Sequence, residues 1–141
     1  MLAADFIINV NNKNVETVMQ ELESSVSKMK IKRKAEISDE NIYLTDLREY
    51  IDYFNEVRGW KPYHNARDLI SSINLEASEL LEIFQWAGKN TELDNKKMAR
   101  IKEELADVLI YSIDLANACG IDMIQIIIEK LIINSQKYPL K

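Results

Sequence analysis

Two pairs of carboxylates are the residues of this chain best suited to chemistry. Glu76 and Glu79 lie in the segment LEASELLE, and Glu104 and Asp107 lie in KEELADVL. Each pair is spaced by three residues inside an apolar helical pattern, which places both carboxylates on one helix face. If the two helices pack antiparallel, all four acidic groups meet in one cleft. Because such a cluster repels itself, it predicts a hard divalent cation, Mg²⁺ or Mn²⁺, that could hold phosphates.

Aromatic residues continue each acidic face. Trp86 follows Glu79 by seven positions and Tyr111 follows Glu104 by seven, which is about two helical turns in both cases. A metal beside aromatic surfaces suits a nucleotide, with phosphate at one end and the base at the other. A third polar group shares the end of the last expected helix and consists of Asn134, Lys137 and Tyr138.

Each of these residues also has a simpler interpretation. Glu-x-x-Glu pairs are common on solvated helices, and nearby basic residues could neutralise part of the cluster. Trp86 and Tyr111 could be core residues, and His64, the only histidine, could be a loop residue bonded to the backbone. The apolar setting of both acidic pairs favours a site, because unpaired buried carboxylates are costly. The nearby basic residues are Lys96, Lys97 and Arg100.

Four helices are predicted to position these residues. Apolar residues at helical spacing indicate helices over residues 45–59, 66–87, 95–119 and 123–136. The short loop between the second and third helices favours antiparallel neighbours. We therefore expect an all-α four-helix bundle over residues 45–141. The expected caps and stops of the last three helices are Asn65, Gly88, Asp94, Gly120, Asp122 and Pro139.

Residues 1–44 are predicted to be an N-terminal appendage that packs on the bundle or on a second subunit. Residues 6–10 could be a short strand, and residues 15–29 have helical spacing. Five basic residues crowd into residues 28–34. We interpret them as a solvated helix end followed by a linker, with phosphate or partner binding as the alternative.

Composition excludes several classes of protein. The net charge of −5 argues against nucleic-acid binding, and the single Cys119 excludes an intramolecular disulfide and a thiolate zinc cluster. No apolar stretch is long enough to span a membrane, and the first ten residues do not resemble a signal peptide. Neither acidic pair has a histidine nearby, which disfavours a di-iron bundle. We expect a cytoplasmic enzyme that binds no membrane.

Several segments match one family pattern in order: LEASELLEIFQW, EELADVLIYSIDLANACGID and INSQKYP. Over roughly residues 45–141, the chain resembles the all-α MazG-like nucleotide pyrophosphohydrolases, and most of all their dCTP pyrophosphatase branch. The family pattern of Glu-x-x-Glu on one helix and Glu-x-x-Asp on the next is matched at Glu76, Glu79, Glu104 and Asp107. The further matches are Trp60 and His64 in W-x-x-x-H, Trp86 in FQW, and Asn134, Lys137 and Tyr138 in N-x-x-K-Y-P.

The resemblance implies hydrolysis of a (deoxy)nucleoside triphosphate to the monophosphate and pyrophosphate. It implies that the four carboxylates hold Mg²⁺, and that dCTP or another pyrimidine deoxynucleotide is the substrate. Glu79 or Glu82 is expected to orient or deprotonate the attacking water. It also implies a homodimer or homotetramer. The residues implied to contact the nucleotide are Trp60, His64, Trp86, Tyr111, Asn134, Lys137 and Tyr138.

Two alternatives stay open. One keeps the fold and changes the reaction, for example to the hydrolysis of dUTP or of a diphosphate. The other is a catalytically silent helical module that senses nucleotide or binds a partner, with the basic stretch at residues 28–34 as its natural contact. The intact set of four carboxylates favours an enzyme.

Overall fold

The protein is described here from a computed structural model, which covers residues 38–40, 42–88 and 91–140. The predicted strand at 6–10, helix at 15–29 and basic run at 28–34 lie outside these residues. The chain divides into two compact units, with the boundary between Pro62 and Tyr63. The predicted domain boundary between residues 44 and 45 stays a prediction, because most of the expected appendage lies outside the described residues.

The first unit contains the helix α2 (Leu44–Val57) and most of the short 3₁₀ helix η2 (Lys61–Tyr63). Helix α2 is amphipathic and buries Ile51 and Asn55. At its end the side chain of Lys61 lies 2.7 Å from the Asp52 carboxylate, which ties the turn after the helix to the helix itself. This unit carries Trp60, one of the residues implied to contact nucleotide.

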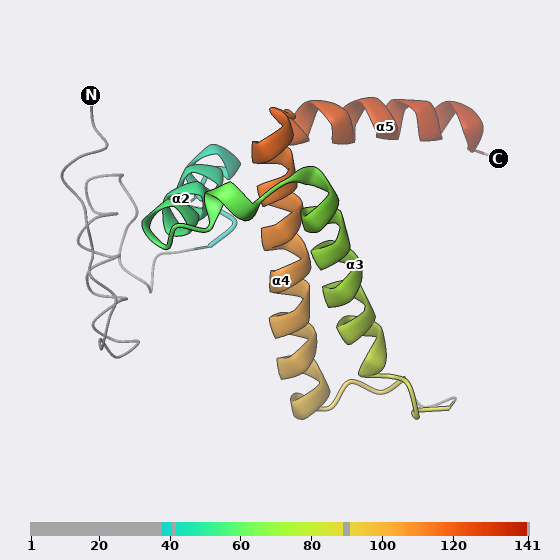
Figure 1. Cartoon of the computed structure of the whole chain (residues 1–141). Coiled ribbons are helices and arrows are strands. Elements are labelled where there is room, and N and C mark those ends of the chain that lie inside the picture. The colour runs from blue at the N-terminus through green and yellow to red at the C-terminus, as the bar shows by residue number, and fades with distance from the viewer. Residues whose placement is uncertain (1–37, 41, 89–90, 141) are drawn as a thin grey trace, which may run out of the picture. The chain divides into compact units, whose positions relative to one another are not determined.

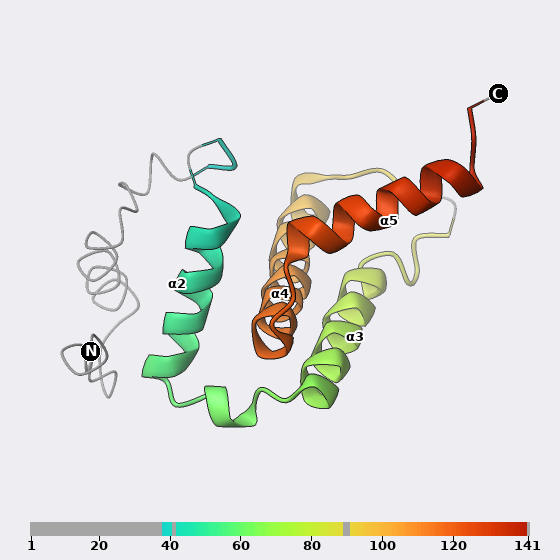
Figure 2. The same cartoon turned by 90° about the horizontal axis from the view of Figure 1, so that it is seen from above.

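The second unit contains α3 (Ala66–Glu82), α4 (Asn95–Cys119) and α5 (Met123–Lys137). Helices α3 and α4 pack side by side and run in opposite directions, as Figures 1 and 2 show. Helix α5 begins at the end of α4 and runs away from the α3–α4 pair (Figure 1). The described residues form four α-helices and no strand, which confirms the all-α prediction.

Local hydrogen bonds and one glycine explain where α4 begins and ends and where α5 begins. The Asp94 carboxylate accepts a hydrogen bond from the backbone N–H of Lys97 at 2.7 Å, and Asp122 caps α5 in the same way. Gly120 ends α4 in the left-handed conformation, with φ of 64°, which glycine adopts without steric cost. These caps lie where the sequence predicts them, so the register of α4 was predictable.

Helix α3 ends earlier than predicted. It begins after Asn65, as expected, but its last residue is Glu82 rather than Ala87. Beyond it, backbone hydrogen bonds run to the third residue back, from Phe84 to Leu81 and from Gln85 to Glu82, each at 3.0 Å. The chain therefore tightens into turns of the 3₁₀ type, and the helical projection that aligned Trp86 with Glu79 does not apply.

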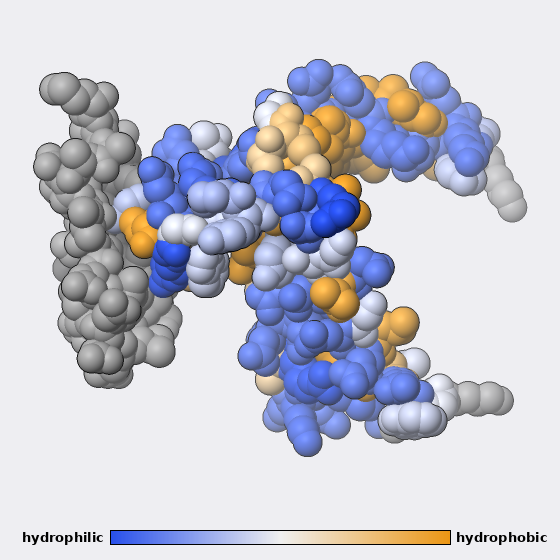
Figure 3. All heavy atoms as spheres, viewed as in Figure 1, coloured by the Kyte–Doolittle hydropathy of each residue, from blue (hydrophilic) through white to orange (hydrophobic). Residues whose placement is uncertain are grey.

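Burial is concentrated on the α3 and α4 side of the second unit. Leu69, Ile113 and Ala116 are buried, whereas every residue of α5 except two is exposed. Figure 3 shows hydrophobic patches along α5. None of the helices in the described ranges is long and apolar enough to cross a membrane. The exposed apolar residues of α5 are Ile124, Ile126, Ile127, Ile128, Leu131, Ile132 and Ile133.

Candidate metal and nucleotide site

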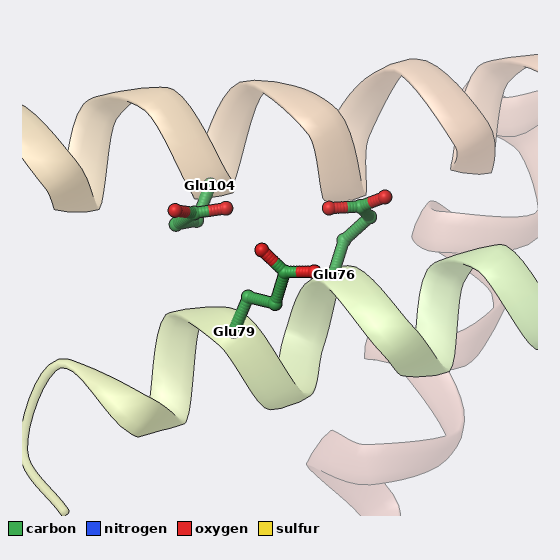
Figure 4. Close-up of side chains that lie close together, drawn as sticks. All are labelled: Glu76, Glu79 and Glu104. Atoms are coloured by element: carbon green, nitrogen blue, oxygen red, sulfur yellow. The ribbon is translucent and has the colours of Figure 1, made fainter.

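Three predicted metal ligands converge between α3 and α4. Glu76 and Glu79 lie one turn apart on α3, and Glu104 faces them from α4 (Figure 4). One carboxylate oxygen from each residue lies within 4.8 Å of the other two. Glu104 is buried in spite of its charge, which is costly unless a cation or hydrogen bonds compensate. The three oxygens are close enough together to contact a single cation placed between them.

Asp107, the fourth predicted ligand, lies one turn further along α4 and is half-buried. It is not one of the three residues whose oxygens form the compact group. Its charge nevertheless acts on the same site. Burial raises the pKa of Glu76, and the negative charges of Asp107, Glu79 and Glu104 raise it further. All four carboxylates thus belong to one electrostatic cluster.

The chemistry of this donor set suits a hard divalent cation. Carboxylate oxygens are the ligands that Mg²⁺ and Mn²⁺ prefer, and Mg²⁺ usually completes its coordination with water and substrate phosphate oxygens. Glu79 is exposed and Glu76 and Asp107 are partly exposed, so a hydrated ion can reach them. The residues present therefore fit Mg²⁺, which the resemblance implied.

Arg100 supplies positive charge at one end of the cluster. Its Nη2 atom lies 3.8 Å from Glu104 Oε1 on the same helix and 3.7 Å from Glu82 Oε2 on α3. The sequence allowed Arg100 as a neutralising residue, and the structure makes it a link between the two helices. Glu82, the alternative catalytic carboxylate, lies beside this arginine rather than within the group of three.

A second polar group continues along α4. Tyr111 is half-buried, and its hydroxyl pKa is raised by burial and by the charges of Glu76, Asp107 and Asp114. Asp114 is buried, and its Oδ2 atom lies 3.9 Å from Nδ1 of His64. Because α3 and α4 are antiparallel, the start of α3 meets the end of α4, which brings His64 to this aspartate. The pairing of His64 with Asp114 was not predicted, although Asp114 follows Asp107 by seven residues and so lies on the same face of α4.

Of the residues implied to contact nucleotide, Tyr111 lies near the carboxylates, but four others in the second unit are not gathered around them. Trp86 is 90% exposed in the turns after α3. Asn134, Lys137 and Tyr138 lie together at the far end of α5, where the Lys137 ammonium lies 5.3 Å from the centre of the Tyr138 ring. Helix α5 carries that end away from the α3–α4 pair (Figure 1). Their predicted contacts with substrate stay predictions.

Trp60, in the first unit, is held by its neighbours. Its ring meets Phe54 edge to face, with ring centres 5.9 Å apart. The Arg58 guanidinium lies 3.3 Å from the centre of the Phe54 ring and 5.9 Å from that of Trp60. The role of Arg58 was not predicted, although an arginine two residues before a tryptophan was a signal that could have been followed. Trp60 stays about half exposed.

An open cleft borders the acidic cluster along α3 and the turns after it, with a volume of about 710 Å³. Glu79 and Glu82 contribute its charged edge. Its wall is largely apolar, so it joins a polar group to an apolar surface, as a nucleotide requires. The other lining residues are Leu75, Ser78, Leu81, Phe84 and Gln85.

The fold and the site define an all-α protein with a cluster of carboxylates on two antiparallel helices. The family model of the MazG-like family matches residues 71–141, which include all four predicted ligands. The chain belongs to the MazG-like family. The resemblance stated from the sequence is thereby confirmed.

Relatives within the family carry an activity in their names. The chain is 38% identical over 102 residues to dCTP pyrophosphatase 1 of Mus musculus and 34% identical over 100 residues to that of Homo sapiens. These matches cover 69% and 68% of this chain, and the chain spans 59% of the length of each relative. It is also similar to the crystal structure of a pyrophosphatase from Archaeoglobus fulgidus. That likeness has a TM-score of 0.61 at 33% identity and covers 74% of this chain and 99% of the other.

Proposed function

We propose that the protein is a metal-dependent nucleoside triphosphate pyrophosphohydrolase that acts on dCTP or a related pyrimidine deoxynucleotide. The observation that carries this proposal is the convergence of Glu76, Glu79 and Glu104 from two helices, with Asp107 beside them. The names of the dCTP pyrophosphatase relatives and of the archaeal pyrophosphatase support the reaction class. The products would be the nucleoside monophosphate and pyrophosphate.

In this proposal the chain's carboxylates bind the metal ion, and one of them takes a proton from the attacking water. Glu76, Glu79, Glu104 and Asp107 would hold Mg²⁺, which supplies charge neutralisation and a more acidic water when bound. Glu79 is the exposed member of the group of three and lies at the cleft, so it is our candidate to take a proton from the attacking water. The water oxygen would bond to the α-phosphorus as the bond from that phosphorus to the pyrophosphate oxygen breaks.

We further propose that the protein works as a homo-oligomer. Helix α5 exposes six isoleucines and one leucine, each about half exposed. A soluble monomer rarely presents an apolar surface of this extent, and a second copy that buried it would account for it. Such an assembly would also bring Asn134, Lys137 and Tyr138 close to a bound nucleotide, which the single protomer does not do.

The test is pyrophosphate release from a panel of nucleoside triphosphates, measured with Mg²⁺ and again with EDTA. We expect turnover with Mg²⁺ that is greatest for a pyrimidine deoxynucleotide and is lost in EDTA. Glu79→Ala and Asp107→Ala should lose it as well. If the wild-type protein is folded and binds nucleotide yet releases no pyrophosphate, the enzyme proposal fails and the nucleotide-sensing alternative takes its place.

A further inference from the structure

Arg100 is placed where it must respond to any cation that binds the acidic cluster. It lies one helical turn before Glu104, and its Nη2 atom also faces Glu82 across the gap to α3. The guanidinium therefore shares Glu104, a candidate metal ligand, with whatever else that carboxylate binds. Nothing in the family resemblance assigns a role to this residue.

The contacts of Arg100 are of a kind that can be exchanged. Both distances, 3.7 and 3.8 Å, are long for an ion pair, and the Arg100 side chain is 42% exposed. Exposed pairs of this kind contribute little to stability and are screened by water. The Glu104 side chain, by contrast, is only 12% exposed, so its position depends mainly on burial within the helix pair. Loss of the arginine should leave this ligand in place.

We propose that Arg100 is the counter-ion that the cluster gives up when it binds its metal, and that the freed guanidinium then binds a phosphate of the substrate. This inference rests on the proposed function. Arg100 competes with a divalent cation for Glu104 and is repelled by it, because both are positive. Once released, its planar fork stays beside the cluster and matches the oxygens of a phosphate.

The proposal predicts that replacing Arg100 changes the affinity for Mg²⁺ and the affinity for nucleotide in opposite directions. Arg100→Gln removes the competitor for Glu104, so it should lower the dissociation constant for Mg²⁺ about two- to fivefold. The same change removes a phosphate contact, so it should raise the dissociation constant for the nucleotide about five- to tenfold. A residue that merely supported the helix pair would weaken both. Arg100→Lys keeps the charge without the fork and should lie between Arg100→Gln and the wild type.

The experiment is calorimetric titration of the full chain, first with MgCl₂ alone and then, in saturating Mg²⁺, with a non-hydrolysable imido analogue of dCTP. Arg67→Gln is the matched control, because Arg67 is 89% exposed on the first turn of α3 and pairs with the adjacent Asp68. Both affinities of the control should equal those of the wild type. A thermal midpoint measured in EDTA reports on folding of each variant.

The outcomes separate this inference from the proposed function. If the wild type binds Mg²⁺ and Arg100→Gln changes neither affinity, the inference is wrong and the proposed function stands. If Arg100→Gln weakens both and lowers the thermal midpoint, Arg100 is a structural support and the inference is again wrong. If the wild type binds no Mg²⁺, the proposed function itself fails.

Discussion

Glu103 and Glu104 are neighbours in sequence with opposite surroundings. Glu104 is buried and points into the group of three carboxylates, whereas Glu103 is exposed on α4. We expect Glu104→Gln to lower kcat/KM for pyrophosphate release by at least about 100-fold, because loss of a ligand should cost more than loss of a residue that only orients one. Glu103→Gln removes the same charge one residue away and should stay within about twofold of the wild type. Equal losses in the two variants would contradict the assignment.

The raised pKa of Glu76 gives a pH dependence of known sign. Its folded-state pKa lies above its ordinary value of about 4.3, so the folded protein keeps this proton to higher pH than the unfolded chain does. The protonated Glu76 therefore favours the folded state below the ordinary pKa. This contribution is lost as pH rises from the ordinary pKa through the higher pKa of the folded state. Glu76→Gln removes the effect, so in EDTA its thermal midpoint should match the wild type near pH 4 and exceed it at pH 8.

Mg²⁺ should reverse that behaviour in the wild type. Metal binding requires the deprotonated carboxylate, so the increase in thermal midpoint caused by MgCl₂ should be small near pH 4 and should grow toward pH 8. Glu76→Gln should show a much smaller increase at pH 8. A metal-induced increase that does not change with pH would count against Glu76 as a ligand.

The carboxylates could be predicted from sequence for a specific physical reason. A spacing of three residues on a helix fixes the shared face locally, and only the antiparallel packing of two adjacent helices had to be added. The predicted nucleotide contacts depend in addition on how separate elements pack. Trp60 belongs to the first unit and Lys137 to the end of α5, so their relation to the carboxylates depends on packing that spacing within one helix does not encode.

At the scale of elements, caps decided how well the helices were predicted. Asp94, Asp122 and Gly120 act through short-range hydrogen bonds or a single backbone conformation, so residue type alone located both ends of α4 and the start of α5. The end of α3 has no such marker. Phe84 and Gln85 continue the apolar helical pattern while their backbone hydrogen bonds shorten to the third residue back, a change that periodicity does not record.

The N-cap of α4 matters because this helix carries Glu104 and Asp107. Asp94 accepts the hydrogen bond from Lys97 at 2.7 Å and places negative charge at the positive end of the helix. Asp94→Ala should lower the free energy of unfolding by about 1 kcal/mol in urea denaturation. Asn95→Ala, at the next exposed position, should change it much less, and Asp94→Ser should recover most of the loss. A full loss in Asp94→Ser would show that charge, not capping, is responsible.

At the scale of the whole molecule, the exposed surface of α5 is the feature that a monomer explains least well. Ile128 is 51% exposed near the middle of this helix, and its apolar neighbours are similarly exposed. Interfaces between copies of one chain are enriched in such apolar residues, and burying them would contribute roughly 25 cal/mol per Å² of apolar surface. The sequence resemblance implied an oligomer, but the partner that covers this surface of α5 cannot be inferred from periodicity.

The proposed assembly predicts that a charge placed on this surface dissociates the protein. Ile128→Glu should convert an oligomer into a smaller species in size-exclusion chromatography with light scattering, because the new carboxylate would be buried unpaired at the interface. Gln136→Glu adds the same charge at another exposed position of α5 and should leave the mass unchanged.

If the assembly also brings the end of α5 to a nucleotide, Ile128→Glu should lose affinity for the dCTP analogue. It should keep its affinity for Mg²⁺, since the carboxylates all lie on α3 and α4. A wild-type protein that is monomeric at working concentration, or a variant that dissociates without loss of nucleotide affinity, would separate the assembly from the activity.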